Sequence, residues 1–299
     1  MIKFYLVTGF LGAGKTTFLK NFIRLLAPQR IHLIINEFGK AGVDGALLQD
    51  VGAVLDQINN GSIFCSCRLD KFEEALQQVL QTQPDAVIAE ASGLSDPTNI
   101  RHVLSSYPAI SYQGSVCLAD ASRLEKVFST ARMCPRQIAV SSLVLLNKTD
   151  LASIEQCETA EQLILQANPA AHIERTRHGR IEPEWLAYIT PVPNVEEAAA
   201  ARDITLQKAS MLIAKTMPKE AMERCLAMLA EDTYRIKGLV TLKEGDFLVD
   251  CTGPVVQLLP WAGETTNRLT LLAGKGMPLR KAVKTAAEWY GGYILEVEV

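Results

Sequence analysis

The sequence has no apolar run that approaches the roughly 18 residues of a membrane-spanning helix. It also has little excess charge, because 30 Lys and Arg residues face 33 Asp and Glu residues and the basic residues form no block. We therefore expect neither a membrane nor a nucleic acid as a partner. The apolar stretch 2–11 is similar to a short signal-peptide core but leads directly into Lys15 of a binding motif, so we expect a cytoplasmic protein.

The cysteines give no disulfide framework. There are seven, an odd number scattered over the chain, and in a reducing compartment they are free thiols or metal ligands. Five of them, among them Cys117, Cys225 and Cys251, lie in apolar segments and are expected in the core.

The hydrophobic pattern predicts two domains. Short apolar runs, each followed by a helical pattern, are typical of a doubly wound α/β domain with a buried parallel sheet and helices on both faces; they span 2–7, 31–35, 86–89, 115–119, 143–146 and 172–176. Helix starts are expected at Asp96-Pro97, at Ser122 with Glu125, and at Ser153 with Gln156. The Pro-containing segment 190–194 ends this domain, so the expected domains are 1–194 and 195–299.

The second part of the chain reads as a small α+β domain with a mostly antiparallel sheet. Its expected helices are 219–231 and 279–290, and its expected strands are 234–242, 246–251, 255–260 and 268–273.

The segment GFLGAGKTT, residues 9–17, is a complete phosphate-binding loop between an apolar strand and an amphipathic helix at 17–26. Glycine permits positive φ angles and a close approach to phosphate oxygens, and the helix N-terminus attracts anions. Lys15 is expected to reach the β- and γ-phosphates and Thr16 to bind magnesium. The remaining expected contacts come from Gly9, Gly12, Ala13, Gly14 and Thr17.

The segment LVLLNKTD places Asn147, Lys148 and Asp150 at the carboxyl end of a buried strand, where open α/β sheets bind ligands. Guanine offers two adjacent N–H donors, which an ionised carboxylate accepts together, whereas adenine offers no such pair. Asp150 therefore predicts GTP over ATP. Asn147 is expected to link this loop to the phosphate loop and the Lys148 stem to cover the base.

Two further loops follow buried strands. In AVIAEASGLSDP, Glu90 is a candidate magnesium ligand and Gly93 a candidate sensor of the γ-phosphate, although an acidic helix start is the alternative for Glu90. In IHLIINEFGKAGVD, Glu37 and Asp44 are candidates for orienting water, and Glu37 also for binding a metal. A solvated loop is the alternative for Asp44.

Cys65 and Cys67 in NGSIFCSCR flank one residue, so an extended backbone projects both thiolates to one side, where they bind a soft metal or form a redox pair. A structural zinc site needs four ligands, and Glu37, a third residue or water would complete it. A bare C-x-C is also frequently incidental.

The motifs GFLGAGKTT, NEFGKAGVD, NGSIFCSCR, EASGLSDP and NKTD, in this order, resemble those of CobW-type GTPases, which are related to the nickel-insertion GTPases of urease and hydrogenase. The segment 235–242, RIKGLVTL, is similar to the start of that family's C-terminal domain. The resemblance implies slow GTP hydrolysis with Mg²⁺ that switches either the affinity for a transition metal such as zinc, cobalt or nickel, or the docking of a partner. We expect that partner to be a client metalloprotein or a cofactor-dependent enzyme, and a homodimer is a further expectation.

The chain departs from the family's C-x-C-C motif in two ways, because Arg68 stands where the last cysteine is expected and Ser62-Ile63-Phe64 alter the usual NGC spacing. Two alternative functions stay open. The first is a GTP-dependent docking chaperone for a cofactor-bearing enzyme, such as a corrinoid protein, whose cysteines bind no metal. The second is a small-molecule kinase, against which stand Asp150 and the lack of an arginine-rich acceptor lid.

Overall fold

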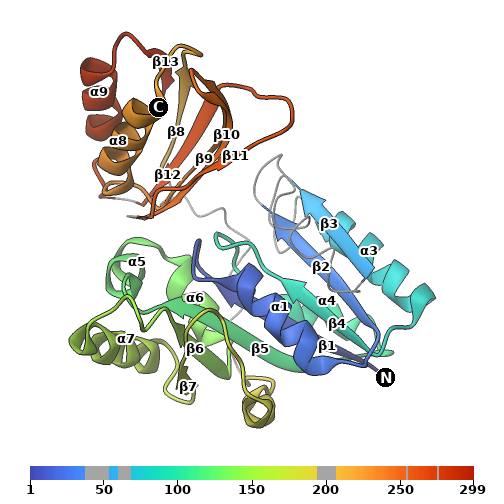
Figure 1. The fold of residues 1–299 in the computed structure, drawn as a ribbon. Coiled ribbons are helices and arrows are strands. Elements are labelled where there is room, and N and C mark those ends of the chain that lie inside the picture. The colour runs from blue at the N-terminus through green and yellow to red at the C-terminus, as the bar shows by residue number, and fades with distance from the viewer. Residues whose placement is uncertain (38–53, 60–68, 194–206, 254, 275) are drawn as a thin grey trace. The chain divides into compact units, whose positions relative to one another are not determined.

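The computed structural model describes residues 1–37, 54–59, 69–193, 207–253, 255–274 and 276–299 (Figure 1). The first part of the chain forms a seven-stranded sheet in the order β3-β2-β4-β1-β5-β6-β7, in which all paired strands are parallel. The strands are β1 (Ile2–Gly9), β2 (Ile31–Glu37), β3 (Val54–Asn59), β4 (Ala86–Glu90), β5 (Ile110–Asp120), β6 (Leu143–Asn147) and β7 (His172–Arg175). The expected parallel sheet is confirmed, and β3 is a strand that the sequence did not predict.

Helices cover both faces of this sheet, as expected. They are α1 (Lys15–Leu26), α3 (Leu69–Thr82), α4 (Ile100–Ser105), α5 (Leu124–Thr130), α6 (Met133–Ala139), α7 (Ile154–Ala167) and the 3₁₀ helix η2 (Pro183–Tyr188). Side chains alternate between the faces, so Phe4 and Leu6 of β1 pack with Phe72 of α3 in one core cluster. Val7 of the same strand packs with Phe18 of α1 in the other.

The helix starts differ in how well the sequence predicted them. Ser153 and Gln156 form the expected capping box at α7, whereas α5 begins after Arg123, because Ser122 donates to Asp120 instead of capping a helix. Asp96 also fails to start a helix. Its Oδ1 accepts from Thr98 in a turn, and α4 begins only at Ile100.

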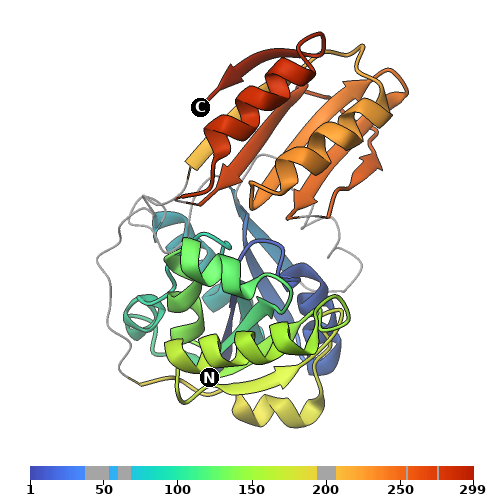
Figure 2. The ribbon, with the colours of Figure 1, turned by 90° about the vertical axis from the view of Figure 1, so that its left-hand side faces the viewer.

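The second sheet is antiparallel throughout its described pairs and has the order β11-β10-β9-β12-β8-β13. Figure 2 shows its two helices side by side on one face. The elements are β8 (Gln207–Ile213), α8 (Lys219–Ala230), β9 (Arg235–Leu242), β10 (Gly245–Thr252), β11 (Leu258–Pro260), β12 (Arg268–Ala273), α9 (Leu279–Trp289) and β13 (Ile294–Glu298). The α+β prediction is confirmed, while β8 and β13 are additional strands.

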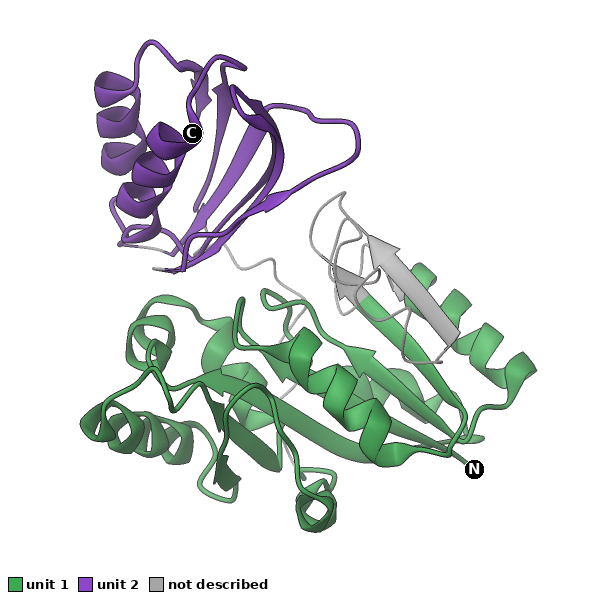
Figure 3. Ribbon diagram, in the orientation of Figure 1, with its two compact units in different colours: residues 1–203 green, residues 204–299 purple. Residues whose placement is uncertain are grey.

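The chain divides into two compact units, Met1–Asp203 and Ile204–Val299, which Figure 3 colours separately as unit 1 and unit 2. Among the described residues, no helix combines the length and the apolar character needed to cross a membrane.

Candidate nucleotide site

The loop between β1 and α1 depends on glycine. Gly9, Gly12 and Gly14 have φ angles of +130°, +73° and +102°, a region that other residues rarely adopt. A Cβ on Gly9 would lie 2.4 Å from the carbonyl oxygen of Leu118 in β5. Gly14 is the N-cap of α1 and has no side chain to cap it, and the first turn contains no acidic residue. The N-terminal charge of the helix dipole is therefore available to an anion.

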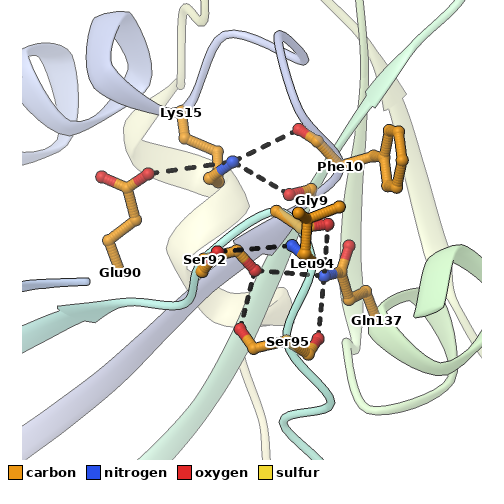
Figure 4. A network of polar contacts seen from close by, with 9 residues as sticks. Gly9, Phe10, Lys15, Glu90, Ser92, Leu94, Ser95 and Gln137 are labelled. Carbon is orange, nitrogen blue, oxygen red and sulfur yellow. Dashed lines mark hydrogen bonds and ion pairs between the residues drawn. The ribbon is translucent and has the colours of Figure 1, made fainter. Parts of the chain in front are cut away.

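Lys15 lies at the centre of this loop and is buried. Its Nζ donates to the carbonyls of Gly9 (2.9 Å) and Phe10 (3.2 Å), and it lies 3.8 Å from Glu90 Oε1 (Figure 4). Strand pairing explains the approach of the carboxylate, because Val7 of β1 is in register with Glu90 at the end of β4. The structure thus brings together two expected site residues whose sequence separation exceeds 70 positions.

The next residues of the loop occupy the first turn of α1. Thr16 is half-buried and Thr17 is exposed, while Ala13 is buried. The helix begins at Lys15, two residues before the expected start. The helix starts early because Gly14, in the left-handed region, is both the last residue of the loop and the N-cap of the helix.

The loop after β4 packs directly on the phosphate loop. A Cβ on Gly93 would lie 2.6 Å from the backbone nitrogen of Leu11, so only glycine allows this approach. The loop is folded by its own hydroxyls, since Ser95 Oγ donates to the Ser92 carbonyl at 2.7 Å and the Leu94 N–H donates to Ser92 Oγ at 3.4 Å. Gly93 therefore lies next to the segment that carries Lys15.

Asn147, at the end of β6, links three loops. Its Nδ2 donates to the Ala13 carbonyl (2.8 Å), and its Oδ1 accepts from the Gly179 N–H (3.0 Å). The expected link between this motif and the phosphate loop is confirmed. A Cβ on Gly14 would lie 2.4 Å from Asn147 Nδ2, so the link also requires glycine at that position.

Lys148 and Asp150 complete the segment. Lys148 has a φ of +62°, and its Nζ pairs with Asp120 Oδ2 at 2.7 Å. Asp120 is held in turn by Ser122, whose backbone N–H and hydroxyl both donate to Oδ1. Asp150 is exposed, and no ion pair joins its carboxylate to any described residue. The carboxylate is accordingly accessible to a ligand that presents adjacent N–H donors.

The geometry described so far is that of a phosphate loop, an acidic strand end and an Asn-Lys-x-Asp segment gathered at the carboxyl ends of β1, β4 and β6. Residues 3–175, more than half of the chain, match the CobW/HypB/UreG nucleotide-binding domain. The chain belongs to the CobW/HypB/UreG family. The resemblance carried by the sequence motifs is thereby confirmed.

Curated relatives of this CobW/HypB/UreG chain match it over part of its length. The zinc chaperone YjiA of Escherichia coli is 30% identical over 187 residues, which cover 59% of this chain and 58% of that protein. The zinc chaperone YeiR of the same organism is 31% identical over 193 residues, covering 62% of this chain and 58% of that protein. This chain thus spans 58% of the length of each. A crystal structure of Zn(II)-bound YjiA GTPase from E. coli aligns with 96% of this chain and 98% of that chain at 20% identity and a TM-score of 0.48.

Four expected site residues of this CobW/HypB/UreG protein fall where side chains are not described. The backbone of Glu37 ends β2, which pairs with β4. Asp44, Cys65 and Cys67 lie outside the described residues. Within the described ranges, no group of three or more His, Cys, Asp or Glu side chains is arranged to hold a metal ion.

The other cysteines of the CobW/HypB/UreG chain are core residues, as expected. All five described cysteines are buried free thiols. Burial raises the pKa of Cys117 to about 12 and holds the pKa of Cys134 well above its usual value. The thiols of Cys117 and Cys134 therefore remain protonated at neutral pH and are poor nucleophiles and poor metal ligands.

Three site residues of this family member were missed by sequence reasoning. Asp120 follows an apolar run at a strand's carboxyl end, a position that does signal a ligand site. Gly179, with a φ of +60°, lies in a His-Gly turn after β7 and contacts Phe18 of α1. Gln137 of α6 donates to the loop after β4, and no local spacing marks it.

Proposed function

We propose that this protein binds and slowly hydrolyses GTP, and that its nucleotide state controls the binding of a transition metal or its delivery to a client protein. One observation carries the proposal. The buried ammonium of Lys15 lies between two loop carbonyls and the Glu90 carboxylate, beside a helix N-terminus without an acidic residue, in a chain of the CobW/HypB/UreG family. Domains 1–194 and 195–299 are the expected GTPase domain and the CobW C-terminal-like domain.

The phosphate contacts come from the glycine loop. Lys15 exchanges its two carbonyl acceptors for phosphate oxygens, and the backbone N–H groups from Gly12 to Thr17 approach the same oxygens. Gly93, in contact with Leu11, presents its N–H to a γ-phosphate.

The donors near Lys15 fit a magnesium ion. Thr16 supplies a half-buried hydroxyl and Glu90 a buried carboxylate, and oxygen donors of these kinds are what Mg²⁺ prefers. Mg²⁺ would neutralise charge that develops on the phosphates. Glu37 or Asp44 would orient the attacking water.

The guanine base is selected by Asp150, whose exposed carboxylate accepts from the ring N–H and the exocyclic amine. Asn147 fixes this segment to the phosphate loop, and the Lys148 stem, held by Asp120, covers the base. Calorimetry with magnesium tests the assignment. We expect wild-type protein to bind GTP at least 100-fold more tightly than ATP. This ratio corresponds to a difference in binding free energy of about 2.7 kcal/mol, which lies within the range of hydrogen bonds to charged groups.

The decisive variant is Asp150→Asn, which loses that preference. Asp246→Asn is the matched control, because Asp246 is likewise an exposed aspartate and no role in nucleotide binding is assigned to it. If Asp150→Asn keeps the preference of wild type for GTP, the base assignment is wrong.

We propose that the transition metal is cargo and binds Cys65 and Cys67. The relatives YjiA and YeiR are both named zinc chaperones, which favours zinc over cobalt and nickel. The two cysteines lie in sequence between Glu37 and Glu90, so a loop change on loss of the γ-phosphate would alter their geometry. Zinc and cobalt titrations with a non-hydrolysable GTP analogue and with GDP should give different affinities. Equal affinities would remove the coupling.

A second candidate function is favoured by Arg68, which stands where the family motif has its last cysteine. In this case the protein is a GTP-dependent docking chaperone for a cofactor-bearing enzyme, and the cysteines bind no metal. The variant Cys65→Ser/Cys67→Ser discriminates between the candidates. Loss of zinc binding and of client activation supports the metallochaperone, whereas intact client activation supports the docking chaperone. For both candidate functions we propose that the protein is cytoplasmic and assembles as a homodimer.

A further inference from the structure

Two consecutive residues of α6, Arg136 and Gln137, reach the loop that follows β4. Gln137 is fully buried, and its Nε2 donates to the carbonyls of Ser92 (3.4 Å), Gly93 (3.2 Å) and Ser95 (3.0 Å) (Figure 4). Arg136 forms an ion pair with the carboxylate of Asp96. Together the two side chains contact both the backbone and the acidic end of one loop, and we call them the α6 clamp.

The clamp rests on a fixed base beside the phosphate loop. The Gln137 backbone carbonyl accepts from the hydroxyls of Thr8 (3.3 Å) and Ser141 (2.9 Å), and Ser141 also contacts the hydroxyl of Ser115 in β5. Thr8 directly precedes Gly9, whose carbonyl accepts from Lys15. One residue of α6 therefore joins the strand that carries the phosphate loop to the loop after β4.

The side-chain amide of Gln137 acts in this contact as a hydrogen-bond donor. Its two N–H protons serve three carbonyls, whereas its Oε1 has no hydrogen-bond partner in the described part of the chain. An apolar side chain of the same size would fill the space and leave those carbonyls without this donor. The contact that the clamp maintains is that of Gly93 with Leu11 in the phosphate loop.

We propose that the α6 clamp positions the loop 92–96 so that Gly93 meets a γ-phosphate without prior rearrangement, and thereby sets the preference of the site for GTP over GDP. This inference rests on the proposed function. A loop that is already ordered loses less conformational freedom on binding, so the gain appears as affinity for the ligand that touches it. GDP lacks the γ-phosphate and does not draw on the loop. Arg136 and Gln137 are thus positioning residues.

The main test is Gln137→Met, which keeps the volume and removes the donor. Affinities for a non-hydrolysable GTP analogue and for GDP are measured by calorimetry with magnesium on the full chain. We expect about tenfold weaker binding of the analogue, since the lost donor serves the equivalent of about one net hydrogen bond, and a GDP affinity within about twofold of wild type. A purely structural defect would weaken both nucleotides alike.

The half-exposed Arg136 provides a second variant that does not disturb the core, should Gln137→Met fail to fold. Arg136→Gln should also weaken the analogue selectively, and adding Asp96→Asn should cause no further loss, because the two side chains act as one pair. Arg132→Gln is the matched control, since Arg132 is exposed at the start of the same helix and has no ion pair with a described residue. Its affinities should equal those of wild type.

The outcomes separate this inference from the function on which it rests. If wild type prefers the GTP analogue and the variants change both nucleotides equally, or neither, the clamp proposal is wrong and the proposed function stands. If wild-type protein binds neither guanine nucleotide, both are overturned.

Discussion

Replacing Asn147 with alanine should loosen three loops at once. The substitution removes the bonds from Nδ2 to the Ala13 carbonyl (2.8 Å) and from the Gly179 N–H to Oδ1 (3.0 Å). Asn147, Ala13 and Gly179 are all buried, so the remaining donor and acceptor lose their partners away from solvent. Two lost bonds, together with the desolvation cost of their former partners, reduce the free energy of unfolding by about 2–4 kcal/mol.

The matched control is Asn21→Ala, which releases the same turn from α1. Asn21 donates to the carbonyls of His178 and Gly179 but is only half-buried, so water replaces it and the expected loss is about 0.5–1 kcal/mol. Urea unfolding of the protein without added nucleotide measures both values. Amide hydrogen exchange of peptides spanning 10–17 and 176–180 should rise together in Asn147→Ala. A loss for Asn147→Ala no larger than that for Asn21→Ala would refute the reasoning.

Two further predictions concern a glycine contact and a buried thiol. Gly93→Ala places a methyl group against the backbone nitrogen of Leu11, so we expect weaker binding of a GTP analogue and slower hydrolysis in turnover assays. The control is Gly292→Ala, whose added methyl group meets no atom within 4 Å and should have no effect. A Gly93→Ala protein with wild-type affinity and turnover would contradict the contact. Burial raises the pKa of Cys225 from 9.0 to about 12, so above pH 9 the unfolded thiol ionises first and stability falls with rising pH. Between pH 9 and 10.5, the free energy of unfolding measured in urea should therefore fall by about 1.5 kcal/mol less in Cys225→Ala than in wild type. Parallel pH profiles of the free energy of unfolding for the two proteins would contradict this.

The sequence predicted best those strands that are buried on both faces. Every residue of β4 and β6 is buried, and the apolar runs 86–89 and 143–146 locate both strands to within one residue. β3 was missed because VLDQIN has Asp56 and Gln57 at its centre and no continuous apolar run. Among the described strands it lies at the edge of the sheet, where it pairs with β2.

In unit 2, the strands β8 and β13 were missed for a related reason. In QKASMLI the fully buried residues are Ala209, Met211 and Ile213, so burial alternates with a period of two and the segment has no continuous buried run. β13 is an edge strand and is mostly exposed. Six strands therefore form a sheet for which four were expected.

The site was predictable where it follows local spacing. The phosphate loop, Glu90 and Asn147 were found because each lies at the carboxyl end of an apolar run in the sequence. Gln137 and Gly179 were not, because they reach the site by tertiary packing of segments distant in the sequence. The helix start expected at Asp96 was wrong for two reasons: one carboxylate oxygen accepts locally from Thr98 in a turn, and the other pairs with the distant Arg136.

The pairing of β8 with β13 has a consequence for how unit 2 is attached. Ser210 is in register with Glu298 and Ile213 with Ile294, so the first strand of the unit and its last run antiparallel as neighbours. The amino end of β8 and the carboxyl end of β13 therefore lie beside each other at one edge of the sheet. A short linker between these two ends, with new ends opened in the β9–β10 hairpin, is thus a circular permutation that the strand order allows.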